Sequence, residues 1–335
     1  MFTPKRLVVI IMVLVGILSV PSSVTAQETG HWWHNIEARV TVCKEEFLLG
    51  EPISIKVVVT NHHSETVHLS DCIYRSFEFF AHDSSGRLVK RLRGPGISGL
   101  FPVVPVRPRA DFNDVVFMNE YLDFPGPGLY TVTYLGYIHV HKGTGINQNM
   151  KVQAIPLSSV VSVKLRQGSS SELETALSQY LKQLKSRDNR LQRQAAHALS
   201  VSEPVLAVKL LGEALEGENG SYPLGATYAT WALAKIGTEP AIQALLNVAT
   251  PPNNIIARID AISELGRWHI KRAVPTLIAL LSDPSAKIRI GALRSLGDIG
   301  DKSCISEVEL RFNDPDEKVR ATAKKVYKKL TKDEK

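Results

Sequence analysis

The sequence lacks the short motifs that most often mark an active site. It contains no GxSxG, HExxH or P-loop pattern, and no CxxC pair occurs anywhere in it. Each of these patterns places a nucleophile, a metal ligand or a phosphate-binding loop at a fixed spacing, so their absence argues against several large classes of enzyme. We therefore expect no catalytic residues and no cofactor.

Cysteine is scarce, with only Cys43, Cys72 and Cys304 in the chain. Cys43 and Cys72 lie in the same predicted domain, and the sequence leaves a disulfide between them open, because spacing alone does not place two Cα atoms within bonding reach. The spacing of this pair matches no zinc motif. Cys304 is expected to be a small, buried hydrophobic residue.

Long apolar runs are absent except at the N-terminus. There LVVIIMVLVGILSV follows the basic start MFTPKR and precedes PSSVTA. This pattern predicts a secretory signal peptide over residues 1–26, cleaved after Ala26. A retained anchor is the alternative, although the run is short for a membrane span of about 20 residues. We expect an exported protein, periplasmic or extracellular, without stable membrane insertion after cleavage.

A concentrated excess of one charge is also absent. The formal net charge is +7, but residues 27–171 carry 14 basic and 13 acidic residues, and residues 172–335 carry 24 and 20. Neither part predicts a nucleic-acid-binding surface, so we expect no nucleic-acid partner. The most basic stretch, GRLVKRLRGPG at 86–96, is expected to be a solvated hairpin, with contact to an anionic surface as the alternative.

Residues 27–165 show the two-residue period of β-strands. IEARVTV and ISIKVVVT alternate side chains in this way, and turn-forming residues separate such segments. About seven short strands without a helical pattern predict a β-sandwich. LLGEPISIKVVVTNHHSETVHLS and FPGPGLYTVTY resemble the immunoglobulin-like modules of exported bacterial proteins. The resemblance implies that Tyr130 is a tyrosine-corner residue whose hydroxyl bonds back to the backbone. A weaker likeness is to a small family of bacterial proteinase inhibitors.

Histidine is concentrated in the same region. His139 and His141 are two residues apart, so they lie on one face of the expected strand and are weak candidates for a metal site. His31 and His34 could add ligands. Solvent-facing histidines are the simpler interpretation, and we expect no bound metal.

After a polar linker at 166–171, the apolar period changes to that of helices. AxxxL segments begin at Ala195, Ala229, Ala261 and Ala292, with offsets of 34, 32 and 31 residues. Such a repeat predicts a solenoid in which each helix pair buries its apolar face against its neighbours. AVPTLIALLSDP and RSLGDIG resemble HEAT repeats of the phycobilisome-lyase-like type. The resemblance covers residues 172–330, about five helix pairs, and leaves 331–335 as a tail. The predicted fold is thus multidomain, an all-β immunoglobulin-like sandwich followed by an all-α HEAT-type solenoid.

An acid and a base recur in the two clearest repeats. Asp283 precedes Arg289 by six residues, and Asp314 precedes Arg320 by the same spacing. Recurrence favours a structural ladder over a catalytic pair, since a catalytic site is needed only once. The pattern weakens upstream. Arg258 lacks the preceding aspartate, and Gln192 and Ala226 stand where the arginine is expected.

These features predict an exported, non-enzymatic protein that binds or scaffolds other proteins through its helical repeats. The expected surface is formed by the second helix of each pair, which carries Lys235, Arg258, Arg267 and Arg294. The alternative is that the β-sandwich acts as a protease-inhibitor-like or glycan-binding module displayed on the solenoid. Lyase activity is not expected, because lyases of the resembled type act on cytoplasmic proteins. The partner's identity and the oligomeric state stay open.

Overall fold

The computed structural model describes residues 23–24, 35–70, 78–92, 104–142, 153–216, 225–251 and 253–332. It divides into two compact units, Met1–Phe47 with Ile53–Arg166, and Leu48–Pro52 with Gln167–Lys335. Apart from Ser23–Val24, the predicted signal peptide lies outside the described residues, as do His31, His34 and Cys72. Within the described ranges, no helix combines the length and the apolar composition that crossing a membrane requires.

The first unit is built from β-sheets. A four-stranded sheet has the order β1-β2-β4-β9, a six-stranded sheet has the order β3-β12-β11-β5-β8 with β6 also paired to β11, and β7 pairs with β10. The strands are β1 Ser23–Val24, β2 Ile36–Val42, β3 Glu46–Leu48, β4 Ser54–Asn61, β5 Val67–Ser70, β6 Glu78–Asp83, β7 Lys90–Arg91, β8 Val104–Val106, β9 Asp111–Phe117, β10 Leu122–Asp123, β11 Gly128–Lys142 and β12 Gln153–Arg166. A single 3-10 turn, η2 Met118–Glu120, follows β9.

Apolar side chains alternate along both larger sheets and form the core of this unit. Ile55, Val57 and Val59 of β4 are buried, as are Val132 and Tyr134 of β11. Their two-residue spacing places each set on one face of its strand. β11 is the longest strand, and it pairs antiparallel with β12, β5 and β6. The two-residue period of the sequence therefore predicts β-structure correctly, but the described residues form twelve strands where about seven short ones were expected, and β11 and β12 are long.

The expected contact of Tyr130 is present. Tyr130 is buried, and its hydroxyl donates a hydrogen bond of 2.7 Å to the backbone carbonyl of Gly126, four residues earlier. The ring also meets Phe124 edge to face, with centroids 5.1 Å apart. This fixes the approach to β11 in the manner of a tyrosine corner.

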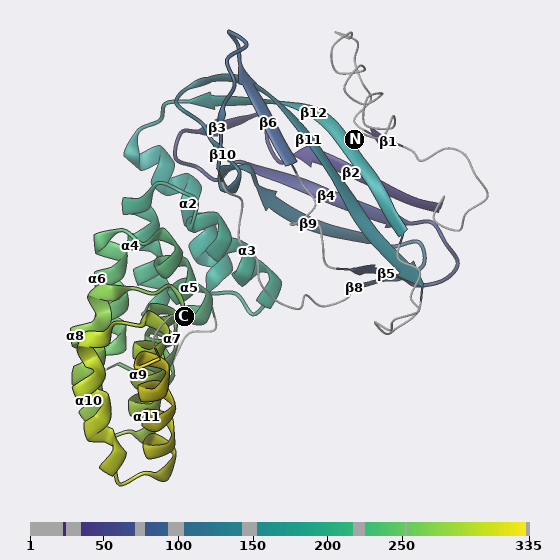
Figure 1. The fold of residues 1–335 in the computed structure, drawn as a ribbon. Coiled ribbons are helices and arrows are strands. Elements are labelled where there is room, and N and C mark those ends of the chain that lie inside the picture. Colours follow the sequence, from purple (N-terminus) through teal and green to yellow (C-terminus); the bar gives the residue numbers. More distant parts are fainter. Residues whose placement is uncertain are drawn as a thin grey trace. The chain divides into compact units, whose positions relative to one another are not determined.

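The described residues of the second unit form five helix pairs (Figure 1). The pairs are α2 Ser170–Leu184 with α3 Asn189–Leu199, α4 Pro204–Leu215 with α5 Ala226–Ile236, α6 Glu239–Ala249 with α7 Ile255–Arg267, α8 Val274–Ala279 with α9 Ala286–Ile299, and α10 Ile305–Leu310 with α11 Glu317–Leu330. Short 3-10 turns flank α8 (η4 Lys271–Ala273 and η5 Leu280–Ser282) and α10 (η6 Lys302–Cys304 and η7 Arg311–Asn313).

Local sequence sets where these helices begin. Ser169 and Glu172 form a reciprocal capping box, so α2 starts at Ser170, two residues before the predicted boundary. Asp188 accepts hydrogen bonds from the first backbone N–H groups of α3, and Glu203 does the same for α4, where Pro204 is the first helical residue.

The first and second helices of the pairs form two separate rows. In Figure 1, α4, α6, α8 and α10 follow one another along one side, and α5, α7, α9 and α11 along the other. We call the first helices of all five pairs, together with the flanking 3-10 turns, the first-helix row, and the second helices of all five pairs the second-helix row. The second helices approach each other closely. A Cβ added to Gly266 would lie 2.6 Å from the side chain of Ser295, whose hydroxyl donates to the carbonyl of Ile262 at 2.8 Å.

Candidate functional site

The arginines and aspartates of the repeat form buried ion pairs that join consecutive helix pairs. Arg289 in α9 contacts Asp314 through two hydrogen bonds of 2.9 and 2.8 Å. Arg258 in α7 forms the equivalent pair with Asp283. All four side chains are buried. We call each such pair, together with the backbone bonds of its arginine, a rung.

The structure corrects the spacing that the sequence suggests for these rungs. The carboxylate that pairs with Arg289 lies 25 residues later, in the following helix pair, and not six residues earlier. Across the six-residue spacing, Arg289 donates instead to the backbone carbonyl of Asp283, at 2.8 Å, and Arg320 does the same to that of Asp314. Because the carboxylate comes from the following helix pair, Arg258 needs no preceding aspartate. It is a rung residue that the sequence did not predict.

Each aspartate also organises the turn that precedes its second helix. Asp283 accepts the N–H of Ser285 at 2.8 Å, and Asp314 accepts that of Asp316 at 3.0 Å. Burial opposes ionisation of Asp314, but the hydrogen bonds from Arg289 and from the Asp316 backbone outweigh it and hold the pKa of this carboxyl below its usual value. The same pairing raises the pKa of the Arg289 guanidinium. Both groups are fully engaged within the fold.

The upstream helix pairs keep only part of this arrangement. Gln192 occupies the arginine position in α3, and its side-chain amide donates to the backbone carbonyl of Ser186 at 2.6 Å, again across six residues. Glutamine thus keeps the hydrogen bond to the backbone carbonyl that the arginine makes in a rung, but it carries no charge to pair with an aspartate. Ala226, at the arginine position of α5, has no side chain that could make either bond.

The histidine candidates are placed differently from the expectation of solvent exposure. His141 lies opposite His68 of β5 in the strand register, and their rings stack with centroids 5.4 Å apart. His141 is fully buried and His68 is 8% exposed. His139 shares the face of His141 but lies opposite Ser70. Within the described residues, no three potential ligands are grouped around a metal position. His68 could have been found by aligning VHLS with the YIHVHK strand.

The cysteines offer no reactive pair. Cys304 is buried, and its burial raises the pKa of the thiol, with the charge of Asp301 acting in the same direction. It therefore behaves as the small hydrophobic residue that the repeat predicts. Cys43 is exposed and Cys72 lies outside the described residues, so the disulfide between them stays an open prediction.

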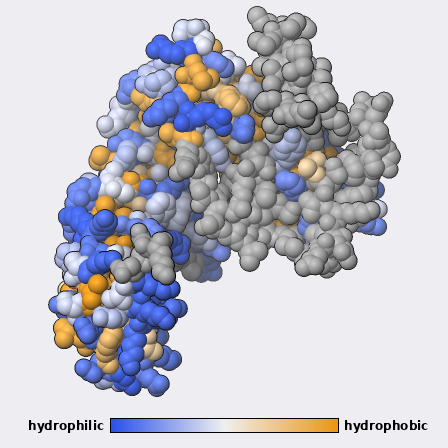
Figure 2. All heavy atoms as spheres, viewed as in Figure 1, coloured by the Kyte–Doolittle hydropathy of each residue, from blue (hydrophilic) through white to orange (hydrophobic). Residues whose placement is uncertain are grey.

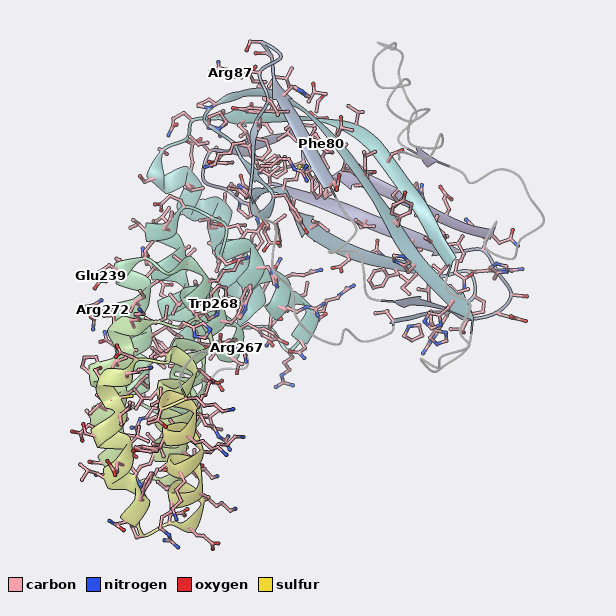
Figure 3. The ribbon with its side chains drawn as sticks, in the orientation of Figure 1. Phe80, Arg87, Glu239, Arg267, Trp268 and Arg272 are labelled. Atoms are coloured by element: carbon pink, nitrogen blue, oxygen red, sulfur yellow. The ribbon has the colours of Figure 1, made fainter. Side chains whose placement is uncertain are left out.

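The basic stretch at 86–96 forms part of a hairpin wherever it is described. Arg87 pairs with Asp83 at 3.2 Å and Lys90 with Asp123 at 3.3 Å, while the guanidinium of Arg91 lies 4.5 Å from the centre of the Phe80 ring. Phe80 and Arg87 are labelled in Figure 3. These cations are engaged with neighbouring side chains of the same unit, which favours the solvated-hairpin interpretation over an anion-binding surface.

Charge is distributed unequally over the two rows of helices. The described second helices carry fourteen Lys and Arg residues and four Asp and Glu residues, whereas the first-helix row carries six of each. In Figure 2, the side of the solenoid along α9 and α11 is densely hydrophilic. The composition of the whole domain does not reveal this difference, because the excess of basic residues lies in the second-helix row only.

The four basic residues named from the sequence fall into different classes. Arg267 and Arg294 are exposed, Lys235 is half-buried with its ammonium group 5.2 Å from the centre of the Trp231 ring, and Arg258 is buried in a rung. The ring of Trp231 also contacts that of His197, with centroids 4.4 Å apart. These contacts place α3 and α5 side by side in the second-helix row.

A tryptophan stands at the C-terminal end of α7. Trp268 is 37% exposed, and its indole N–H donates to the carboxylate of Glu264 at 3.1 Å. Arg267 pairs with the same carboxylate at 3.3 Å, and Figure 3 shows Arg267 and Trp268 next to each other. Burial raises the pKa of Glu264 in spite of these contacts. The buried carboxyl group orients an aromatic ring that is partly open to solvent.

Comparison with known proteins supports the repeat. Residues 252–328 match HEAT repeats, and residues 226–250 match the PBS lyase HEAT-like repeat. Comparison with curated proteins gives no match.

Several solved structures are similar to the chain over about half its length. The complex of CpcE and CpcF of phycocyanin lyase from Nostoc sp. PCC7120 is 29% identical, with a TM-score of 0.36, and the match covers 46% of this chain and 65% of that one. Human deoxyhypusine hydroxylase in complex with glycerol is 20% identical, with a TM-score of 0.33 and coverage of 47% and 74%. A designed armadillo repeat protein in complex with the peptide (KR)4 is 17% identical, with a TM-score of 0.33 and coverage of 49% and 87%. The chain thus spans just under two thirds of the Nostoc protein. Its C-terminal unit is a helical-repeat solenoid, of which residues 226–250 and 252–328 match HEAT-type repeats.

Proposed function

We propose that this chain is an exported, non-enzymatic protein whose HEAT-repeat solenoid binds another protein through the second-helix row. The observation that supports this most is the unequal use of the two rows. The buried side chains of the second helices hold the stack together, while the same helices expose Arg267, Arg294 and Ile256, and Trp268 at the end of α7 is partly exposed. Arg and Trp are enriched at the energetic centres of protein interfaces.

A non-enzymatic role agrees with the way the titratable groups are used. The recurring aspartates and arginines are buried in rungs, and Cys304 is a buried thiol with a raised pKa. The lyase activity named for the Nostoc complex is not extended to this chain.

For the first unit we propose an immunoglobulin-like β-sandwich. The hydrogen bond from Tyr130 to Gly126 and the two larger antiparallel sheets favour it. Export is tested by Edman sequencing of the protein recovered from outside the cytoplasm of the native cell. The proposal expects Gln27 as the first residue, whereas a retained Met1 would overturn cleavage.

Site-specific photo-crosslinking in native cells tests the binding surface. A photo-reactive residue at Ser263, exposed on α7 in the second-helix row, should give a discrete crosslinked product. The same residue at Lys182, exposed on α2 in the first-helix row, is the matched control and should give none. Equal products at both positions, or none at Ser263, would contradict the proposal.

The alternative function of the β-unit is tested in the same experiment. Tyr137 of β11 is 53% exposed. A product at Tyr137 without one at Ser263 would favour a protease-binding sandwich displayed by the solenoid. Release of glycan-linked material at that position would favour glycan binding.

A further inference from the structure

The solvent-facing side of α9 and α11 carries several cations but few acidic side chains, and one of the cations, Lys329 of α11, pairs with Asp298 of α9 at 2.8 Å. Lys287 and Arg294 of α9 are exposed, as are Lys318 and Lys325 of α11, and none of the four forms an ion pair with a residue in the described ranges. Lys287 and Lys318 are 31 residues apart, as are Arg294 and Lys325, so each pair occupies equivalent positions of consecutive helix pairs. Like charges therefore lie next to each other on adjacent helices.

Two cations of the first-helix row pair with carboxylates of the same row. Lys209 of α4 pairs with Glu174 of α2 at 2.5 Å, and Arg272 of η4 pairs with Glu239 of α6. Figure 3 shows Glu239 and Arg272 together on the first-helix side of the solenoid. A surface that only has to keep a protein soluble mixes the two signs of charge in this way. Adjacent like charges oppose stability, so the cations of α9 and α11 point to a role other than stability.

Aliphatic side chains lie within the same surface. Ile290 falls between Lys287 and Arg294 on α9, because residues at i, i+3 and i+7 share one face of a helix. Ile259 is its equivalent on α7, and Ile256, one turn earlier, is 53% exposed. A phosphate backbone or an anionic lipid headgroup offers nothing to isoleucine side chains. A polypeptide with carboxylates and apolar side chains can satisfy the cations and the isoleucines together.

We propose that this basic face, formed by Ile256, Lys287, Ile290, Arg294, Lys318 and Lys325, binds an acidic segment of the partner protein. Carboxylates of the segment contact the cations of α9 and α11, and an apolar side chain packs against the isoleucines of α7 and α9. The segment crosses α7, α9 and α11 in turn, as the stacking of these helices requires. This inference rests on the proposed function and specifies the chemistry of its partner.

Selection of binders from a library of short random peptides tests this chemistry with the purified protein. Selected peptides should be enriched in Asp and Glu, with at least one large apolar residue. Reversing two cations in Arg294→Glu/Lys325→Glu should weaken their binding roughly tenfold or more, since each reversal replaces an attraction by a repulsion. Lys182→Glu/Lys302→Glu makes the same change in net charge at exposed positions of the first-helix row and should leave the affinity unchanged.

Two further measurements separate binding from folding and from simple charge attraction. Thermal unfolding of Arg294→Glu/Lys325→Glu should show a Tm close to that of the wild type, because Lys325→Glu relieves repulsion on the lysine-rich α11 while Arg294→Glu adds a like charge four residues from Asp298. Ile256→Ser should weaken peptide binding without any change in charge. Equal binding by the wild type and this variant would remove the isoleucines from the proposal.

The remaining outcomes are also decisive. Selection that yields no peptides, or peptides without acidic enrichment, would overturn the proposal, as would equal losses in the two charge-reversed variants. So would tight binding of single-stranded DNA or phosphatidylglycerol vesicles in the absence of acidic-peptide binding. If crosslinking at Ser263 succeeds while acidic enrichment fails, the proposed function stands and only the partner's chemistry is wrong. If the crosslink fails as well, both are wrong.

Discussion

The three C-terminal helix pairs and the two N-terminal pairs share one repeat but are joined differently. From α6 onwards, two buried Arg–Asp rungs connect consecutive pairs. Upstream, Gln192 supplies a neutral hydrogen bond, and Ala226 supplies nothing at the equivalent position. The match to HEAT repeats over 252–328 covers the part that has the rungs. Stacking of apolar faces is thus sufficient to continue the solenoid, and the rungs add a connection whose removal leaves a charge buried.

The largest expected effect comes from breaking a rung. Arg289→Ala leaves Asp314 buried without its counter-ion, and we expect the free energy of unfolding to fall by about 3–5 kcal/mol. Gln192→Ala, at the equivalent upstream position, removes one neutral hydrogen bond and should lower it by about 1–2 kcal/mol. Urea unfolding followed by circular dichroism measures both. Equal losses would mean that the charge adds nothing to the connection.

A close helix contact should give the next largest effect. In Gly266→Ala, the new Cβ would meet Ser295 at 2.6 Å, so α7 and α9 must separate. We expect a loss of about 1–3 kcal/mol in the free energy of unfolding, as for other overpacked cores. Gly212→Ala in α4 is the matched control. No atom lies within 4 Å of its added Cβ, and alanine favours the helix by up to about 1 kcal/mol. Destabilisation by both changes would contradict the packing argument.

Acid should weaken the rung that contains Asp314. The pKa of this carboxyl is lowered in the folded protein, so its contribution to stability is complete above the unfolded value of about 3.9 and is lost as the pH falls through the folded value. At neutral pH, Asp314→Asn should be less stable than the wild type. The difference should begin to shrink below about pH 4, where the carboxyl of the unfolded chain becomes protonated, and should be lost once the pH falls below the lowered pKa of the folded protein. A difference that persists unchanged in acid would show that the carboxylate charge is irrelevant.

The smallest expected effect is at the end of α7. His269 has φ = 52°, whereas α5 and α9 end with Gly237 at 63° and Gly300 at 74°. Glycine adopts this left-handed conformation without steric cost, so His269→Gly should raise the free energy of unfolding by less than about 1 kcal/mol, partly offset by loss of the 2.6 Å contact of its ring to the carbonyl of Asp298. The reciprocal change Gly300→His should lower it. Differential scanning calorimetry detects both, and a loss of stability in His269→Gly or a gain in Gly300→His would contradict the steric argument.

The solenoid could be predicted from the sequence because its signal is repeated. The AxxxL segments that begin at positions such as Ala261 and Ala292 recur at a nearly constant spacing within helical patterns. This recurrence is what predicted five helix pairs. The strands of the first unit were also predicted, since alternation along β4 and β11 reports one buried face. The start of α2 was misplaced by two residues, because Ser169 caps the helix within the segment that was predicted as a linker.

The partners of charged side chains could not be predicted in the same way. Spacing along the chain suggested that Arg289 pairs with Asp283. The guanidinium instead binds Asp314 of the next helix pair, which lies near it only because the helix pairs are stacked. Arg258 looked unpaired for the same reason. The basic face could not be predicted because the exposure of a side chain depends on how its helix is rotated about its axis. This rotation buries Arg258 and exposes Arg294, although the sequence grouped the two together. The pairing of His68 with His141 required the strand register.

The two halves of each rung lie in different repeats, and this gives the stack a direction. An arginine binds a carbonyl of its own repeat and the carboxylate of the repeat that follows, at a constant spacing of 31 residues from Arg258 to Arg289 and from Asp283 to Asp314. A tandem duplication of one such stretch would therefore supply both an acceptor for the arginine before it and a donor for the aspartate after it. Deletion of one whole stretch would likewise leave no charge stranded. This part of the chain can change length by complete repeats without leaving a buried ion unpaired, whereas a shift by any partial repeat would leave one.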